Sequence, residues 1–423
     1  MKKIAPITVM LILLLHSSLF SQTDTLRICS YNLLKFSENS GASRLKYMRH
    51  IMNEIDPDVL VVQEMMTPGG VKVVLDSVFN YLQPDKFSSG PFVDGPDTDN
   101  AIFYRTGKLT LVTNRQLATD LRDISEYTLK SGDVTFRVYS LHLKASSGSS
   151  NESRRLAEVA VLRSHLNNLN PTSSFLVAGD YNIYSASEPA FSKLTGSETD
   201  NDGRAFDPLG QSGNWHNNPN YSAIHTQSVR TEQFGGGSTG GLDDRFDMIL
   251  VSESMLSQNT DPKAISMYIL PETYTAFGND GNHFNQSIVT GNNSAVDFST
   301  ADALHEMSDH LPLYADFVVR SNSIVSAIDE AGGLPENYVL QQNYPNPFNP
   351  TTTISYRIAH PAEVALLVYD TAGRLLATIV DELQQPGEHN VSFSARDFAS
   401  GIYIYRLQVD GRFEVAKKMT VLK

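Results

Sequence analysis

The chain has 423 residues, an apolar fraction of 41% and a formal net charge of −14. This composition is ordinary for a soluble globular protein, and the length allows two or three domains. The acidic balance repels polyanions and no run of lysines or arginines offsets it, which weighs against a high-affinity nucleic-acid binder but not against a metal-dependent hydrolase.

Residues 1–21 read as a secretory signal peptide. Lys2 and Lys3 precede an apolar run from Ile7 to Leu15, and small residues follow before Gln22. This order is typical of an export signal, and the run is too short to span a bilayer. Removal of the segment would change the formal charge from −14 to −16, because the two lysines are its only charged residues. No other apolar stretch is long enough for a membrane span, so we expect export without a membrane anchor.

Cys29 is the only cysteine, which excludes an internal disulfide. Its place in a predicted strand, Leu26–Tyr31, indicates a buried core residue.

From Thr25 onward, strand and helix signals alternate. The predicted helices, marked by apolar residues at helical spacing, are Arg44–Ile55, Val71–Leu82 and Glu152–Leu169. The predicted strands are Leu26–Tyr31, Val59–Gln63, Ala101–Tyr104, Asp133–Leu143, Phe175–Ile183, Phe246–Val251 and Leu313–Val319. Strands interleaved with helices predict an α/β layered domain over residues 24–320.

Two long polar insertions interrupt this pattern, at Gly196–Gly241 and Gly278–Met307. Loops of this length in a compact domain are functional rims or mobile segments. Trp215, in the first insertion, could stack a nucleobase or could pin the loop.

The last part of the chain differs in character. Residues 321–340 are small and polar and are expected to form a linker, and residues 341–423 carry short alternating strands that predict a small all-β sandwich. These strands are expected at Thr353–Ile358, Glu363–Tyr369, Leu375–Val380, Glu388–Phe393, Ile402–Val409 and Glu414–Val421. No cluster of catalytic residue types lies there, so this is expected to be an accessory module.

Polar residues of metal-ligand and proton-transfer types recur at the predicted strand ends of the first domain. They are Asn32, Glu64, His142, Asp180, Asn182, Asp247, Asp309 and His310. Alternate side chains of an extended strand point the same way, so Asp180 and Asn182 are expected to project together. Each position also has an ordinary explanation, such as a solvated cap at Glu64, a satisfied core histidine at His142 or a partner for Arg245 at Asp247. The recurrence favours a shared site.

These residue types suit phosphoester hydrolysis. Carboxylates are hard donors that hold Mg²⁺ or Mn²⁺, which neutralises charge on the phosphoryl group. A nearby base readies the attacking water, and a histidine beside a carboxylate supplies an imidazolium. A zinc site is less favoured, because the sequence has no HExxH motif and no cysteine cluster.

Six segments resemble the endonuclease/exonuclease/phosphatase superfamily, which includes DNase I and the magnesium-dependent sphingomyelinases. They occur in the family's order and are Ser-Tyr-Asn32, Pro-Asp-Val-Leu-Val-Val-Gln-Glu64, Ser-Leu-His142-Leu-Lys, Gly-Asp180-Tyr-Asn182, Arg-Phe-Asp247-Met-Ile-Leu and Ser-Asp309-His310-Leu-Pro. The resemblance implies a DNase I-like α/β (α+β) four-layer sandwich, with two mixed β-sheets packed face to face and helices outside.

The resemblance also implies roles for these residues. Glu64 would be the principal Mg²⁺ or Mn²⁺ ligand, with Asn32 and Asp309 as ligands or holders of its waters. Asp180 would orient or deprotonate the attacking water, and the substrate phosphate would be bound by Asn32, Asn182, His142 and His310. Asp247 would hold the tautomer of His310. Leu34 stands where the abasic-site repair branch has aspartate, which argues against that branch.

The tail resembles the type A sorting domain of the type IX secretion pathway. The segments that carry this likeness are Tyr-Pro-Asn-Pro-Phe, Val-Tyr-Asp-Thr-Ala-Gly-Arg, Gly-Ile-Tyr-Ile-Tyr-Arg and the terminal Lys-Lys-Met-Thr-Val-Leu-Lys. It implies passage through the periplasm by the type IX machinery to the cell surface or the medium.

The expected function is therefore that of a secreted, monomeric, metal-dependent phosphodiesterase, foremost an extracellular nuclease acting on DNA or RNA. One alternative is a phosphatase or a sphingomyelinase-like phospholipid hydrolase, which an exposed aromatic hairpin would favour; the sequence shows none. Another is a non-catalytic binding protein on a decayed scaffold, which the loss of a ligand or base would favour; every position is occupied.

Overall fold

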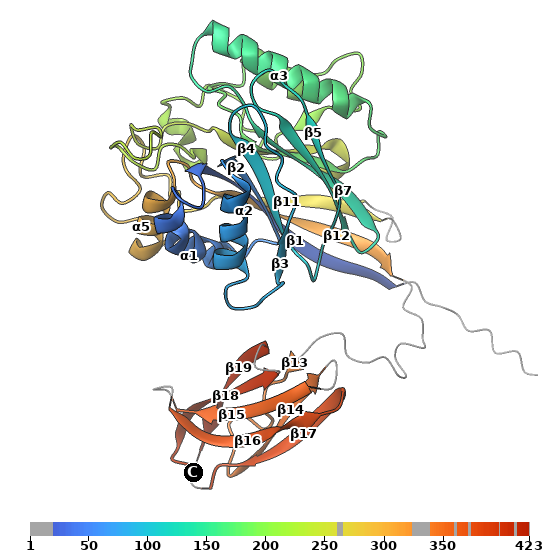
Figure 1. The fold of residues 1–423 in the computed structure, drawn as a ribbon, viewed down its shortest axis with the longest axis vertical. Helices are drawn as coiled ribbons and strands as arrows, with labels where there is room; N and C mark the ends of the chain where they lie inside the picture. Colours follow the sequence, from blue (N-terminus) through green and yellow to red (C-terminus); the bar gives the residue numbers. More distant parts are fainter. Residues whose placement is uncertain are drawn as a thin grey trace, which may run out of the picture. The chain divides into compact units, whose positions relative to one another are not determined.

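The computed structural model describes residues 20–259, 265–323, 339–358, 362–370, 374–396, 398–409 and 413–422. The described residues up to 323 form one compact unit, and those from 339 form a second (Figure 1). Residues 1–19 of the predicted signal peptide and residues 324–338 of the predicted linker lie outside the described residues.

The first unit contains two six-stranded sheets. In the first sheet, ordered β11-β12-β1-β2-β4-β3, the strands are β1 (Phe20–Phe36), β2 (Val59–Met65), β3 (Phe87–Ser89), β4 (Asp99–Arg105), β11 (Ser266–Ala276) and β12 (Leu313–Ser323). In the second sheet, ordered β5-β6-β7-β8-β10-β9, they are β5 (Thr110–Leu117), β6 (Ile124–Ser131), β7 (Val134–His142), β8 (Phe175–Asp180), β9 (Ala205–Phe206) and β10 (Asp247–Ser252). Both sheets are mixed, because β1 pairs parallel with β2 and antiparallel with β12, and β8 pairs parallel with β7 and antiparallel with β10.

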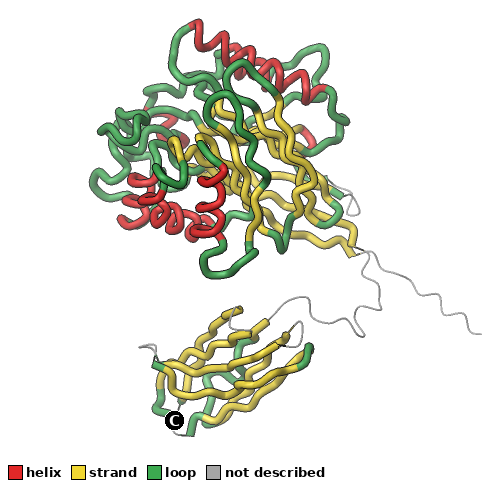
Figure 2. The backbone as a smooth tube through the Cα atoms, viewed as in Figure 1, coloured by secondary structure: helices red, strands yellow, loops and turns green. Residues whose placement is uncertain are grey.

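Helices cover the outer faces of both sheets (Figure 2). They are α1 (Leu45–Ile55), α2 (Pro68–Val74), α3 (Ser149–Asn167), α4 (Pro189–Thr195) and α5 (Phe298–Met307). Buried apolar residues of α1, α2 and α5 pack against the first sheet, and those of α3 and α4 pack against the second. A third cluster joins the sheets, with Val61 of β2 and Ile249 of β10 among its members. These are the four layers that the family resemblance implied, and Cys29 is buried as expected.

Several elements differ from the prediction. The helix predicted at Val71–Leu82 begins at Pro68, where the Thr67 side chain accepts the backbone N–H of Gly70, and leaves α-helical geometry at Leu75. Strands β3, β5, β6, β9 and β11 and helices α4 and α5 were not predicted from the sequence. β5 is mostly exposed at a sheet edge, so it lacks the alternating apolar pattern of a half-buried strand.

The second unit is the all-β module that the sequence predicted. A three-stranded sheet, β13-β14-β17, and a four-stranded sheet, β16-β15-β18-β19, share one apolar core. The strands are β13 (Val339–Leu340), β14 (Thr351–Ile358), β15 (Ala362–Tyr369), β16 (Leu375–Gln384), β17 (Gly387–Ser394), β18 (Gly401–Val409) and β19 (Phe413–Val421). Within the described parts of the chain, none of the helices combines the length and apolar character needed to cross a membrane.

Candidate active site

Three polar side chains lie in one row at the end of the second sheet. His142 on β7 and Asp247 on β10 are both register partners of Asp180 on β8. The row is tight because β7 and β8 approach closely at Gly179, where an added Cβ atom would lie 2.0 Å from the carbonyl oxygen of Leu141 and φ is +147°. Only glycine tolerates both this close contact and this positive φ, so Gly179 permits the close approach of β7 and β8.

Asn32 connects this row to the first sheet. Its Nδ2 atom lies 3.2 Å from Oε1 of Glu64 on β2 and 3.1 Å from Oδ2 of Asp180 on β8. Its Oδ1 atom accepts the backbone N–H of Leu34 at 3.0 Å, which fixes the orientation of the amide. Asn32 therefore holds two carboxylates, one from each sheet, at the same place.

Glu64 is the most accessible carboxylate of this group. Its side chain is 14% exposed, whereas the side chain of Asp180 is 2% exposed. One oxygen faces Asn32 and the other accepts the backbone N–H of Lys35 at 2.9 Å. Glu64 also has a φ of +59°, a left-handed conformation that non-glycine residues adopt at a cost of about 1–3 kcal/mol and that clusters at functional sites.

His310 lies against Asp247. Its Nδ1 atom is 2.7 Å from Oδ2 of Asp247, and its Nε2 atom is 3.6 Å from Oδ2 of Asp180. Burial alone would lower the pKa of His310, but the carboxylates of Asp247, Asp180 and Asp309 together raise it well above its ordinary value. The surrounding carboxylates therefore favour the imidazolium form of His310.

The pKa of His142 is shifted in the opposite direction. Its Nε2 atom lies 3.4 Å from Oδ2 of Asp180 and 3.9 Å from Oε1 of Glu64. Burial and then the positive charge of Arg122 lower the pKa of His142 well below its ordinary value. Its Nδ1 atom is buried without a hydrogen-bond partner among the described residues, so His142 is not the satisfied core histidine of the ordinary explanation.

Asp180 lies between the two histidines. Burial raises the pKa of its carboxyl; the His310 charge opposes this, and the carboxylates of Asp247 and Glu64 raise it further, so the net shift is upward. Oδ1 of Asp180 accepts the backbone N–H of Asn182 at 3.1 Å. Asn182 has a φ of +51°, so its backbone, like that of Glu64, is in the left-handed conformation.

Asp309 faces a loop of the first insertion. Its Oδ2 atom accepts the backbone N–H of Ser238 at 2.6 Å and lies 3.2 Å from Nε2 of Gln227. Gln227 also lies 2.6 Å from Nε2 of His310, so one amide contacts both residues of the Asp309-His310 pair. Nothing in the sequence singled out Gln227, because an isolated polar residue in a long loop carries no periodic signal.

Trp215 pins its loop and does not present a surface for base stacking. It is fully buried, its ring centroid lies 5.2 Å from that of Phe191, and the guanidinium of Arg245 lies over it. Arg245 pairs with Asp207 at 2.8 Å, which also removes it as the partner proposed for Asp247 in the ordinary explanation.

A second cluster combines one residue of the first insertion with two residues just after its end. Among the residues that the structure describes, the group of three histidine, cysteine or acidic side chains with metal-ligand spacing is His216, Asp243 and Asp244, whose ligand atoms lie within 4.8 Å of one another. His216 and Asp244 also form an ion pair, with 2.8 Å between Nδ1 and Oδ1. Glu64 and Asp309, the acidic ligands expected from the sequence, are not part of such a group.

Residues 29–310 match the model of the Endonuclease/Exonuclease/phosphatase family, and residues 342–422 match the Secretion system C-terminal sorting domain. Both resemblances drawn from the motifs are thereby confirmed. No curated protein matches the chain.

Solved structures with a similar fold include a humanized D. rerio TDP2 carrying 14 mutations, with 16% identity, 69% of this chain and 98% of that chain covered, and a TM-score of 0.46. An endonuclease/exonuclease/phosphatase family protein from Bacteroides thetaiotaomicron has 15% identity, 71% and 97% coverage and a TM-score of 0.43. The human Nocturnin catalytic domain with bound sulfate has 16% identity, 70% and 97% coverage and a TM-score of 0.41.

Proposed function

The chain belongs to the Endonuclease/Exonuclease/phosphatase family, and from this premise we propose that it is a secreted, divalent-metal-dependent phosphodiesterase that acts as an extracellular nuclease on DNA or RNA. The observation that carries the proposal is the arrangement around Asp180, where His142 and His310, whose pKa values are shifted in opposite directions, approach the same carboxylate oxygen. Opposite pKa shifts of titratable groups in one site are typical of acid–base catalysis.

Glu64 would hold a Mg²⁺ or Mn²⁺ ion, with Asn32 and Asp309 as further ligands or as holders of its waters. The residues present fit such an ion, because carboxylate and amide oxygens are hard donors and Glu64 is accessible while Asp180 and Asp309 are buried. When bound, the ion would neutralise negative charge on the phosphoryl group.

Proton transfer and phosphate binding would be carried out by side chains of the protein. Asp180 would take a proton from the attacking water at Oδ2, and its raised pKa makes it a stronger base. His310 would donate its Nε2 proton to a phosphate oxygen, while Asp247 holds the Nδ1 proton in place. His142 and Asn182 would orient the phosphate beside them.

The test is a substrate panel for the purified full-length protein. Duplex DNA, single-stranded DNA, RNA, sphingomyelin and bis-p-nitrophenyl phosphate are each incubated with Mg²⁺, with Mn²⁺ and with EDTA. We expect hydrolysis of nucleic acid and of bis-p-nitrophenyl phosphate with either ion and none with EDTA. Hydrolysis of sphingomyelin alone would move the proposal to a phospholipid substrate, and no hydrolysis under any condition would overturn it.

The C-terminal unit indicates where the protein is located. We propose that residues 341–423 direct the protein through the type IX machinery to the cell surface or the medium, after the signal peptide has carried it to the periplasm. Deletion of these residues should retain the protein inside the cell with full hydrolytic activity. Continued appearance of the truncated protein outside the cell would contradict this route.

A further inference from the structure

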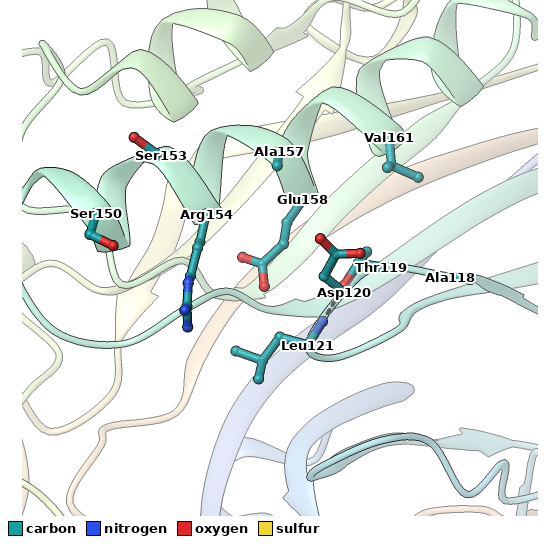
Figure 3. Close-up of a pocket in the computed structure, with 10 residues that line it drawn as sticks. All are labelled: Ala118, Thr119, Asp120, Leu121, Ser150, Ser153, Arg154, Ala157, Glu158 and Val161. Carbon is teal, nitrogen blue, oxygen red and sulfur yellow. Dashed lines mark hydrogen bonds between the residues drawn. The ribbon is translucent and has the colours of Figure 1, made fainter.

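A pocket of about 770 Å³ lies between α3 and the loop that joins β5 to β6 (Figure 3). One wall is formed by residues of α3 between Ser150 and Val161, and the other by the loop Ala118–Leu121. The volume suits a ligand of nucleotide size. None of the lining residues belongs to the candidate active site.

The pocket lies close to that site. β7 ends at His142 and α3 begins at Ser149, so the first turn of α3 lies at the same end of the second sheet as the His142 side chain. Oε2 of Glu158, in the pocket wall, accepts the backbone N–H of Lys144 at 3.0 Å. Because two residues of extended chain span roughly 7 Å, Glu158 lies within about 10 Å of the His142 backbone.

Glu158 has an unused acceptor. The residue is 4% exposed, and its Oε1 atom is buried without a hydrogen-bond partner among the described residues. Burial raises the pKa of this carboxyl. An unpaired buried acceptor is unfavourable, so a donor that reaches it from the pocket would stabilise the carboxylate.

Arg154 supplies a positive charge beside it. Within the described part of the chain, Arg154 has no ion pair or hydrogen bond, and Figure 3 shows its side chain and that of Glu158 both reaching from α3 toward the loop. A guanidinium binds phosphate through paired donors. Leu121 and Val161 add apolar surface, and Val161 is 40% exposed.

We propose that this pocket binds one nucleotide of the substrate strand next to the scissile phosphodiester, with Arg154 paired to its phosphate and Glu158 accepting a hydrogen bond from the amino group of its base. The inference rests on the proposed nuclease function. A carboxylate accepts from N4 of cytosine, and thymine has no amino group, so the pocket favours cytosine over thymine. The volume favours a nucleotide over a smaller phospholipid headgroup.

The test measures binding to the full-length protein in EDTA, where we expect no hydrolysis, so the result does not depend on catalytic activity. Fluorescence anisotropy compares labelled oligo-dC with oligo-dT. We expect tighter binding of oligo-dC, loss of that preference in Glu158→Leu, which has no acceptor, and about 10-fold weaker binding of both oligonucleotides in Arg154→Ala. Arg320→Ala removes the same charge near the opposite end of the first unit, at the end of β12, and should change neither affinity.

A second measurement separates this inference from the proposed function. Bis-p-nitrophenyl phosphate is too small to reach the pocket, so Arg154→Ala should hydrolyse it at the wild-type rate. Unchanged oligonucleotide affinities in both variants, or competition by phosphoethanolamine but not by deoxycytidine monophosphate, would overturn the pocket assignment even if the wild-type protein is an active phosphodiesterase. Changed affinities in a protein without hydrolytic activity would support the pocket and refute the nuclease.

Discussion

Nδ1 of His310 lies 2.7 Å from Oδ2 of Asp247, and the two side chains are 2% and 0% exposed. A buried imidazole beside a buried carboxylate is held in one orientation. The pair lies across two elements, β10 and the segment before β12, so its geometry depends on the packing of the two sheets.

Asp247→Asn should inactivate the protein without unfolding it. Loss of the carboxylate removes a charge that raises the pKa of His310, so the imidazolium is lost at lower pH than in the wild type. We expect kcat to fall by about 100-fold or more, and the alkaline limb of the pH profile of kcat/KM to move to lower pH. Asp56→Asn, at an exposed site, is the control. An alkaline limb that stays in place would refute the role of Asp247.

Glu64→Gln should abolish the response to metal. Glutamine keeps the size of the side chain and its contact with Asn32 but removes the charge that would attract the cation. Isothermal titration with Mn²⁺ should lose its tightest binding event, and hydrolysis should fall by about 100-fold or more at every ion concentration. Glu54→Gln, on the exposed side of α1, should match the wild type. Wild-type Mn²⁺ affinity in Glu64→Gln would move the metal site elsewhere, with the His216 cluster as the next position to test.

Gly179→Ala should prevent the row of polar side chains from forming. The new Cβ atom would lie 2.0 Å from the carbonyl oxygen of Leu141, in a backbone conformation that alanine disfavours. We expect a loss of more than about 3 kcal/mol of stability or insoluble protein. Gly107→Ala is the matched control, because nothing lies within 4 Å of its added Cβ atom. Equal unfolding midpoints in urea for the two variants would contradict the close approach of β7 and β8.

Asp99→Asn should make stability less dependent on pH. Burial raises the pKa of Asp99 to about 6; the N–H of Gly95 opposes the shift, and the carboxylates of Asp94 and Asp123 reinforce it. The folded state then binds more protons than the unfolded state, whose carboxyl has a pKa of about 3.9, so wild-type stability falls as pH rises from about 4 to about 6.

Asparagine cannot ionise, so the variant lacks this fall in stability with rising pH. The difference in Tm between Asp99→Asn and the wild type should therefore rise in favour of the variant across that interval and level off above it. Asp133→Asn, in the exposed turn between β6 and β7, should follow the wild type at every pH. A constant difference between Asp99→Asn and the wild type from pH 4 to pH 8 would show that Asp99 does not titrate in this range.

The sequence predicted the layered fold because its central strands are nearly continuous apolar runs. Val59–Gln63 and Phe175–Gly179 carry that signal and are buried on both faces. The polar residues at their ends were found for the same reason, since Glu64 and Asp180 each interrupt an apolar run. The structure brings these two residues together through Asn32, a contact that strand spacing could not specify.

Some elements and site residues were not predicted from the sequence, for two different reasons. α5 carried a usable signal that was missed, because Asp297 caps it by accepting the N–H of Thr300 and apolar residues follow at helical spacing. Gln227 and the His216 cluster carried none. Their positions depend on how the first insertion and the residues after it fold, which is decided by tertiary contacts rather than by local pattern.

The close approach of β7 and β8 at Gly179 has a consequence for evolution and for engineering. Main-chain pairing sets the separation of the His142 and Asp180 backbones, so lengthening or replacing neighbouring loops should leave that separation unchanged. Grafting of foreign segments onto the rim of this scaffold should therefore change what is recognised while the reactive geometry is inherited intact.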